Sequence, residues 1–73
     1  MISDPKVAEQ ISTLMLEISG RLDSSVAVVN KTSTAEEAAV YRRAVGKVLG
    51  EILLEVLNPL YAKHSSLKPA GFE

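Results

Sequence analysis

The chain has no cysteine and no tryptophan, and it has a single histidine, His64. The lack of cysteine excludes disulfide scaffolds, thiol nucleophiles and zinc sites built on thiolates. One histidine supplies too few ring nitrogens for a histidine-bound metal centre. The sequence also lacks a nucleophile–base pair, a glycine-rich phosphate loop and paired catalytic carboxylates. We therefore expect no metal, no cofactor and no enzymatic activity.

An excess of charge of one sign is missing as well. Eight basic residues stand against nine acidic ones, for a net charge of −1, so there is no bulk attraction to nucleic acid or anionic lipid. No segment approaches the roughly 20 apolar residues that a membrane span requires. The N-terminal region carries Asp4 and Glu9, where a signal peptide has a basic and then an apolar stretch. These absences predict a cytoplasmic protein without a nucleic-acid or membrane partner.

Hydrophobic residues make up 47% of the 73 positions and charged residues 23%, which is the composition of one small folded domain. The hydrophobic residues recur at steps of three and four, with a mean near 3.67, which is a helical period. The first stripe consists of Val7, Ile11, Met15, Ile18, Leu22, Val26 and Val29, widened by Leu14. The second consists of Ala38, Tyr41, Val45, Leu49, Ile52, Val56 and Leu60, widened by Val48, Leu53 and Leu57. The polar side of the first stripe, which includes Ser12, is expected to face water.

Local signals mark where these helices begin and end. Asp4 is a good N-cap, and Pro5 suits the first helical position because its missing N–H costs nothing there. Between the stripes, Ser33 or Thr34 precedes a glutamate by three residues, which is the spacing of a capping box. Pro59 removes a helical hydrogen bond and disfavours α conformation at the residue before it. The helix is therefore expected to kink there, and either to restart with Asn58 as N-cap or to continue.

These patterns predict an all-α fold, an antiparallel helical hairpin with helices at about 5–30 and 34–64 and a kink near Pro59. Residues 1–64 form the single domain, and residues 65–73 are expected to be a flexible C-terminal tail because they lack periodicity. Within that tail, Leu67, Pro69 and Phe72 form a candidate docking segment.

The apolar face of the second helix is too wide for one partner helix. It covers about 200° of a wheel with 100° per residue, roughly twice what a single partner hides. The surplus predicts that two hairpins dimerise into a four-helix bundle, with the two-fold symmetry common in small oligomers. The predicted interface consists of Ile11, Ile18, Leu22, Arg42, Val45, Gly46, Leu49, Gly50, Leu53 and Leu57.

Two features of this predicted interface need an explanation. On the wheel, Arg42 lies near the middle of the apolar face, where a cation must extend its head to water, pair with Glu17 or Asp23, or bind an anion. Gly46 and Gly50 together cost about 2 kcal/mol relative to alanine in a helix. That cost suggests a compensating close crossing of helices at the dimer interface.

The function expected from the sequence is a small non-enzymatic interaction or adaptor module that acts as a homodimer. One alternative is an accessory or regulatory subunit that lends its second apolar face, or its tail, to a larger protein complex. The other alternative is a bundle that holds a small apolar ligand between its helices. A cooperative, concentration-dependent melting transition distinguishes the homodimer from a subunit that needs a different partner.

Overall fold

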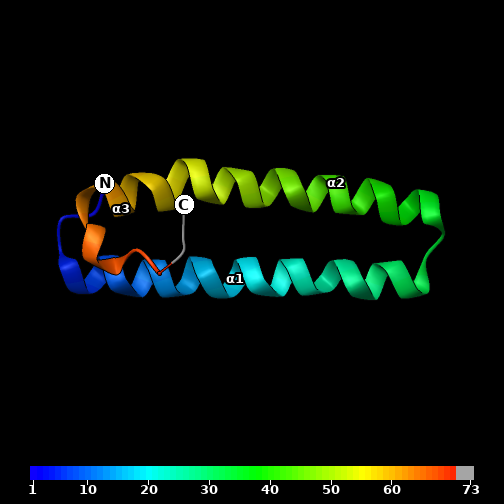
Figure 1. Ribbon diagram of the computed structural model, residues 1–73, viewed down its shortest axis with the longest axis horizontal. Helices are drawn as coiled ribbons and strands as arrows, with labels where there is room; N and C mark the ends of the chain where they lie inside the picture. Colours follow the sequence, from blue (N-terminus) through cyan, green and yellow to red (C-terminus); the bar gives the residue numbers. More distant parts are fainter. Residues whose placement is uncertain (71–73) are drawn as a thin grey trace.

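The computed structural model describes residues 1–70, and within them it contains helices and no strand. Helix α1 (Pro5–Thr32) and helix α2 (Ala35–Glu51) run antiparallel and are joined by a short turn (Figure 1). A π-helical segment, η1 (Ile52–Leu57), leads into helix α3 (Asn58–Lys63), and a single 3₁₀ turn, η2 (Ser65–Leu67), follows. The predicted all-α hairpin is confirmed, with both helices close to their predicted bounds.

The N-terminal caps form as the sequence signals indicate. The Asp4 side chain accepts hydrogen bonds from the backbone N–H groups of Lys6 at 2.8 Å and Val7 at 3.4 Å, and Pro5 begins α1. At the start of α2, the backbone N–H of Glu37 donates to Thr34 Oγ1, and the backbone N–H of Thr34 donates to Glu37 Oε1. The capping box therefore uses Thr34 rather than its neighbour in sequence. Both caps satisfy backbone donors that a helix start leaves without intrahelical partners.

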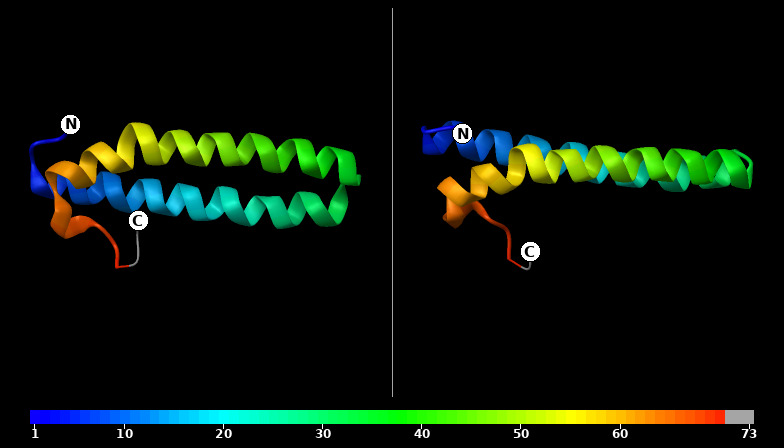
Figure 2. Two further views of the ribbon diagram at one scale, coloured as in Figure 1. Left: turned by 45° about the horizontal axis from the view of Figure 1, so that its top comes forward. Right: turned by 90° about the horizontal axis from the view of Figure 1, so that it is seen from above.

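The bend near Pro59 is not the start of a new helix with Asn58 as its N-cap. Asn58 keeps helical dihedral angles, φ −61° and ψ −48°, and its backbone N–H bonds to the carbonyl of Leu53, five residues earlier. The chain therefore continues through a π turn, and it bends away from the line of α2 in this region (Figure 2). A proline ring clashes with the carbonyl four residues before it in a regular helix. The wider π turn relieves that clash without ending the helix.

The core lies at the end of the hairpin away from the α1–α2 turn. Its buried residues are Ala8, Leu57, Leu60 and Tyr61. Partly buried side chains surround them: Ile2, Ile11, Met15, Ile52, Leu53 and Leu67. Since Leu60 and Tyr61 belong to α3, the bend at η1 delivers them onto the N-terminal half of α1. Both ends of the described chain thus pack against the same small core.

Hydrogen bonds tie the first residues of the chain to the end of α3. His64, the C-cap of α3, places Nε2 2.6 Å from the backbone carbonyl oxygen of Ile2. A carbonyl oxygen only accepts, so Nε2 carries the hydrogen of this bond. The Lys63 ammonium donates to Ser3 Oγ at 3.2 Å nearby. These contacts hold the N-terminal segment across the end of the hairpin.

The C-terminal segment turns back toward α1 after α3. Leu67, in η2, packs against the core, and Pro69 is partly buried. Phe72, the third residue of the predicted docking segment, lies outside the described residues, as do the other positions of 71–73. The flexibility of the tail as a whole stays a prediction.

Two tyrosine–serine hydrogen bonds link α1 to the second half of the hairpin. Ser12 Oγ and Tyr61 Oη lie 2.5 Å apart, and both residues are buried. The expectation that Ser12 faces water is therefore wrong, because Tyr61 reaches across from α3 and gives the hydroxyl a partner inside the core. Ser25 Oγ and Tyr41 Oη lie 2.6 Å apart near the α1–α2 turn. These two bonds lie near opposite ends of the long helix pair.

Candidate functional site

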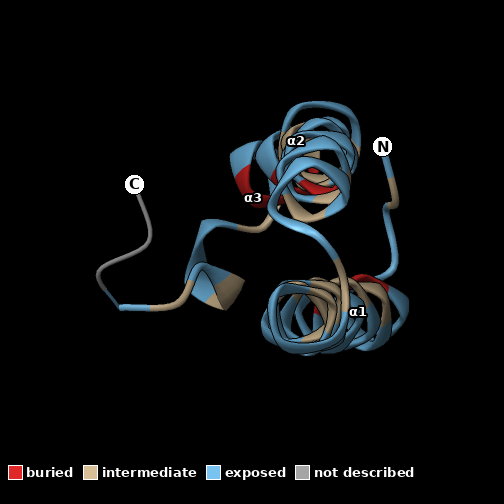
Figure 3. Ribbon diagram, turned by 90° about the vertical axis from the view of Figure 1, so that its right-hand side faces the viewer, coloured by how far each residue is buried: buried red, intermediate tan, exposed pale blue. Residues whose placement is uncertain are grey.

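The hairpin is long and thin, and it hides few of its hydrophobic side chains. Its principal extents are 45 × 20 × 16 Å, and Figure 3, which looks along the helices, shows a single pair of rods with exposed surface on both broad sides. In residues 1–70 the buried hydrophobic residues are Ala8, Val45, Leu57, Leu60 and Tyr61. The large hydrophobic residues left exposed are Met1, Val7, Leu14, Leu16, Ile18, Val28, Val40, Val48 and Leu54.

The hydrogen bond between Ser25 and Tyr41 sets the register of the two helices. Because the helices are antiparallel, two turns (about seven residues) from this bond toward the core lead to Ile18 on α1 and to Val48 on α2. One further turn leads to Leu14 and Ile52. These side chains therefore lie in successive levels on one broad side of the hairpin.

We call this side the open face and define it by its exposed apolar residues. They are Val7, Leu14 and Ile18 from α1, and Val40 and Val48 from α2. The half-buried Ile11 and Tyr41 fill the seam between them. By helical phase the open face is turned away from the C-terminal segment, which lies on the other side of the pair (Figure 3).

A shallow hollow ends the open face beside the α1–α2 turn. It is lined by Glu36, Glu37, Val40, Tyr41 and Ala44, and its surface is almost entirely apolar. The hydroxyl of Tyr41 is directed to Ser25, whose own hydrogen goes to the carbonyl of Leu22 at 2.5 Å. A serine hydroxyl has one hydrogen, so Tyr41 is the donor to Ser25. The hollow therefore offers apolar surface with two carboxylates at its rim.

The ten residues of the predicted interface fall into three environments. Two are buried inside the single hairpin: Val45 and Leu57. Five are half-buried: Ile11, Leu22, Leu49, Gly50 and Leu53. Three are exposed: Ile18, Arg42 and Gly46. By helical phase, Ile11 and Ile18 lie on the open face, whereas Arg42, Gly46, Gly50 and Leu53 lie on the opposite side.

The predicted interface set leaves out four residues of the open face, namely Val7, Leu14, Val40 and Val48. A signal for two of them is present in the sequence, since Val40, Ala44 and Val48 follow one another at steps of four, which places them in one row along a helix. The wheel alone does not reveal which edge of the stripe faces the partner helix. The observed inward direction passes through Val45, which moves Val40 and Val48 to the exposed edge.

Neither glycine of the Gly46–Gly50 pair is in close contact with another helix of this chain. A Cβ atom added at either position would have no heavy atom within 4 Å apart from the helix's own neighbouring atoms. The close crossing expected at these glycines is therefore absent inside the hairpin, and the prediction for a dimer interface stays a prediction. Arg42 is exposed, and its three possible roles stay predictions.

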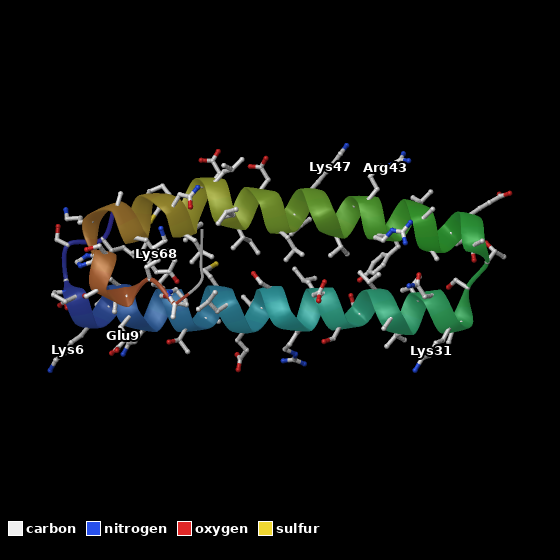
Figure 4. The ribbon with its side chains drawn as sticks, viewed as in Figure 1. Lys6, Glu9, Lys31, Arg43, Lys47 and Lys68 are labelled. Carbon is white, nitrogen blue, oxygen red and sulfur yellow. The ribbon has the colours of Figure 1, made fainter. Side chains whose placement is uncertain are left out.

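The rest of the surface is polar and mixed in charge. Arg43 and Lys47 project from α2 away from α1, and Lys6, Glu9 and Lys31 project from the outer side of α1 (Figure 4). Within residues 1–70, no three His, Asp or Glu side chains are grouped closely enough to hold a metal ion. None of the helices in that part of the chain combines the length and the hydropathy needed to cross a bilayer.

The chain matches no family model, no curated protein and no solved structure. The open face, with the hollow at its end, is therefore the candidate site on the strength of its own chemistry. That chemistry is the removal of apolar surface from water, which drives most protein association.

Proposed function

We propose that this protein is a non-enzymatic protein–protein interaction module that acts as a homodimer, with two hairpins packed into a four-helix bundle. The observation that carries the proposal is the small buried core of the single chain, beside a row of exposed Val, Leu and Ile side chains along one face. Contiguous apolar patches of this kind mark association surfaces in soluble proteins. The proposal includes the cytoplasmic location expected from the sequence.

Self-association is favoured over a foreign partner on two grounds. The net charge of −1 gives two copies almost no mutual repulsion. A helix pair with one apolar side is also self-complementary, because a second identical pair presents the same side, and two-fold dimers are the commonest oligomers. The accessory-subunit alternative shares the same face and is distinguished by experiment.

Sedimentation equilibrium from about 1 to about 100 µM tests the proposal, since this range brackets micromolar dissociation constants. We expect a molar mass twice the 7.8 kDa of the chain at the higher concentrations. The thermal midpoint should rise with protein concentration, because dimerisation links stability to mass action. A cooperatively folded species that stays monomeric across the range would overturn the homodimer.

A further inference from the structure

Resting on the proposed dimer, we infer that the second copy packs on the open face with the two α1–α2 turns at the same end of the bundle. In this arrangement the two-fold axis runs parallel to the helices, and α1 of one copy lies against α2 of the other. The alternative two-fold axis crosses the helices, places the turns at opposite ends, and puts α2 against α2.

The size of the open face suits a second copy. The whole molecule extends over 45 by 20 Å across its broad side, which leaves room for the roughly 800 Å² that each partner buries in a stable interface. A short peptide would cover only part of this length. An identical hairpin has the same length and the same apolar side, so it can cover the face from the N-terminal segment, which crosses this side at the core end (Figure 3), to the hollow.

Charge decides how the second copy is oriented. On α2, Glu37 lines the hollow at one end of the open face. Glu51 follows Ala44 by two turns and Glu55 follows Val48 by two turns, so these glutamates share the same border of α2. All three are exposed. Packing α2 against the α2 of a second copy would bring two acidic borders together, which is unfavourable.

The matching border of α1 is different. Glu17 and Arg21, which lie one turn apart on α1 and are both exposed, border the open face, whereas Glu9 and Asp23 fall on the opposite side of the helix by phase. This border of α1 therefore carries no net charge. Packing α1 against the partner's α2 keeps the two acidic borders of α2 apart, and this arrangement requires the turns to be at the same end.

Exposed valines near the turn support the same orientation. Val28 on α1 is 61% exposed and Val40 on α2 is 67% exposed, although both lie within about two turns of the α1–α2 turn. With the turns together, the end of each α1 meets the beginning of the partner's α2, so these valines approach each other across the interface. With the turns apart, Val28 would instead face the first turns of the partner's α1, where Lys6 and Glu9 are exposed, and Val40 would face the end of the partner's α2 and η1.

A spin-label measurement tests the orientation. Lys31 projects outward at the turn end of α1 (Figure 4), and the chain has no cysteine, so Lys31→Cys gives one label per chain. Double electron–electron resonance should show a separation on the order of 30 Å, from helix spacings of about 10 Å plus the two label arms. A separation near the 45 Å length of the hairpin would overturn the orientation and leave the dimer standing.

A matched pair of variants tests the face. Ile18 and Leu16 are each 37% exposed on the same helix, but helical phase puts Ile18 on the open face and Leu16 on the other side. Ile18→Glu should shift the sedimentation equilibrium to monomer at least tenfold, and Leu16→Glu should leave it unchanged. The reverse result would overturn the proposed face. Val48→Glu repeats the test on α2, with far-UV circular dichroism as the check of folding.

The outcomes separate the two levels of the proposal. A wild-type protein that stays monomeric removes both the proposed function and this inference. A wild-type dimer with a long label separation, or one that survives both Ile18→Glu and Val48→Glu, removes the inference alone.

Discussion

The phenolic hydroxyls of Tyr61 and Tyr41 each form a hydrogen bond with a serine on α1, but the two bonds differ in how far they are buried. Tyr61 is 5% exposed and bonds to the equally buried Ser12, so water has little access when that bond is lost. Tyr41 is half-buried, and its partner Ser25 also bonds to a backbone carbonyl. The same chemical pair should therefore matter more at the core end, because a buried polar group without a partner pays its full desolvation cost.

Tyr61→Phe should lower the free energy of unfolding by about 1 kcal/mol, and Tyr41→Phe by distinctly less. Urea unfolding at one protein concentration measures both. A double-mutant cycle of Tyr61→Phe with Ser12→Ala should show a coupling energy of roughly 0.5–1 kcal/mol, since the two hydroxyls are in direct contact. A coupling energy of zero would mean that the bond contributes nothing to stability.

The helix ends and the bend are decided at the scale of the element. Asp4 and the Thr34–Glu37 pair satisfy backbone donors within one turn of the residues that signal them. Local signals of this kind do not set the position of the π segment, because that position depends on where Leu60 and Tyr61 pack against α1. A π turn contains one residue more than an α turn, so it rotates the following helix about its axis. The observed rotation buries the side chains of Leu60 and Tyr61 in the core.

Thr34→Ala should destabilise the protein by about 1 kcal/mol, because it removes the oxygen that accepts the Glu37 N–H. Ser33→Ala is the matched control. Ser33 has the same hydroxyl chemistry one position earlier, but it is not the cap of α2, so its replacement should change the unfolding midpoint by only a few tenths of a kcal/mol. Equal losses at the two positions would contradict the assignment of the cap to Thr34.

At the scale of the whole molecule, the hairpin is closed at one end by both ends of the chain and left thin elsewhere. Ile2 and Leu67 pack on the same core from opposite ends of the sequence, and His64 bonds to the carbonyl of Ile2. Toward the α1–α2 turn, the buried hydrophobic residue of α2 is Val45. The buried residues that stabilise the hairpin are therefore concentrated at the core end.

Leu67→Ala should cost roughly 1–2 kcal/mol, about half of what a fully buried leucine costs, because Leu67 is half-buried against the core. Leu54→Ala serves as the comparison. Leu54 is 63% exposed and belongs to neither the core nor the open face, so its truncation should leave the urea midpoint nearly unchanged. If both variants behave alike, the C-terminal segment does not hold the core.

The two helices, their caps and their antiparallel order follow from local sequence signals, because helical periodicity and capping act over a few neighbouring residues. In the predicted stripe of α2 and η1, the residues from Ala38 to Val56 are buried or half-buried, apart from Val48, which is exposed. On α1, three members of the predicted stripe, Val7, Leu14 and Ile18, are exposed. Helical periodicity alone does not distinguish the residues of α1 that face α2 from the exposed residues next to them on the same helix.

Three features come from the packing of the helices against each other: which edge of each stripe is exposed, where the π turn lies, and the burial of Ser12. These outcomes depend on the rotation of one helix against the other, which contacts distant in sequence set, such as the Ser12–Tyr61 and Ser25–Tyr41 bonds. A helical wheel gives relative angles within one helix and carries no information about the direction of its neighbour. That direction is what turns a wide hydrophobic stripe into a core on one side and an open face on another.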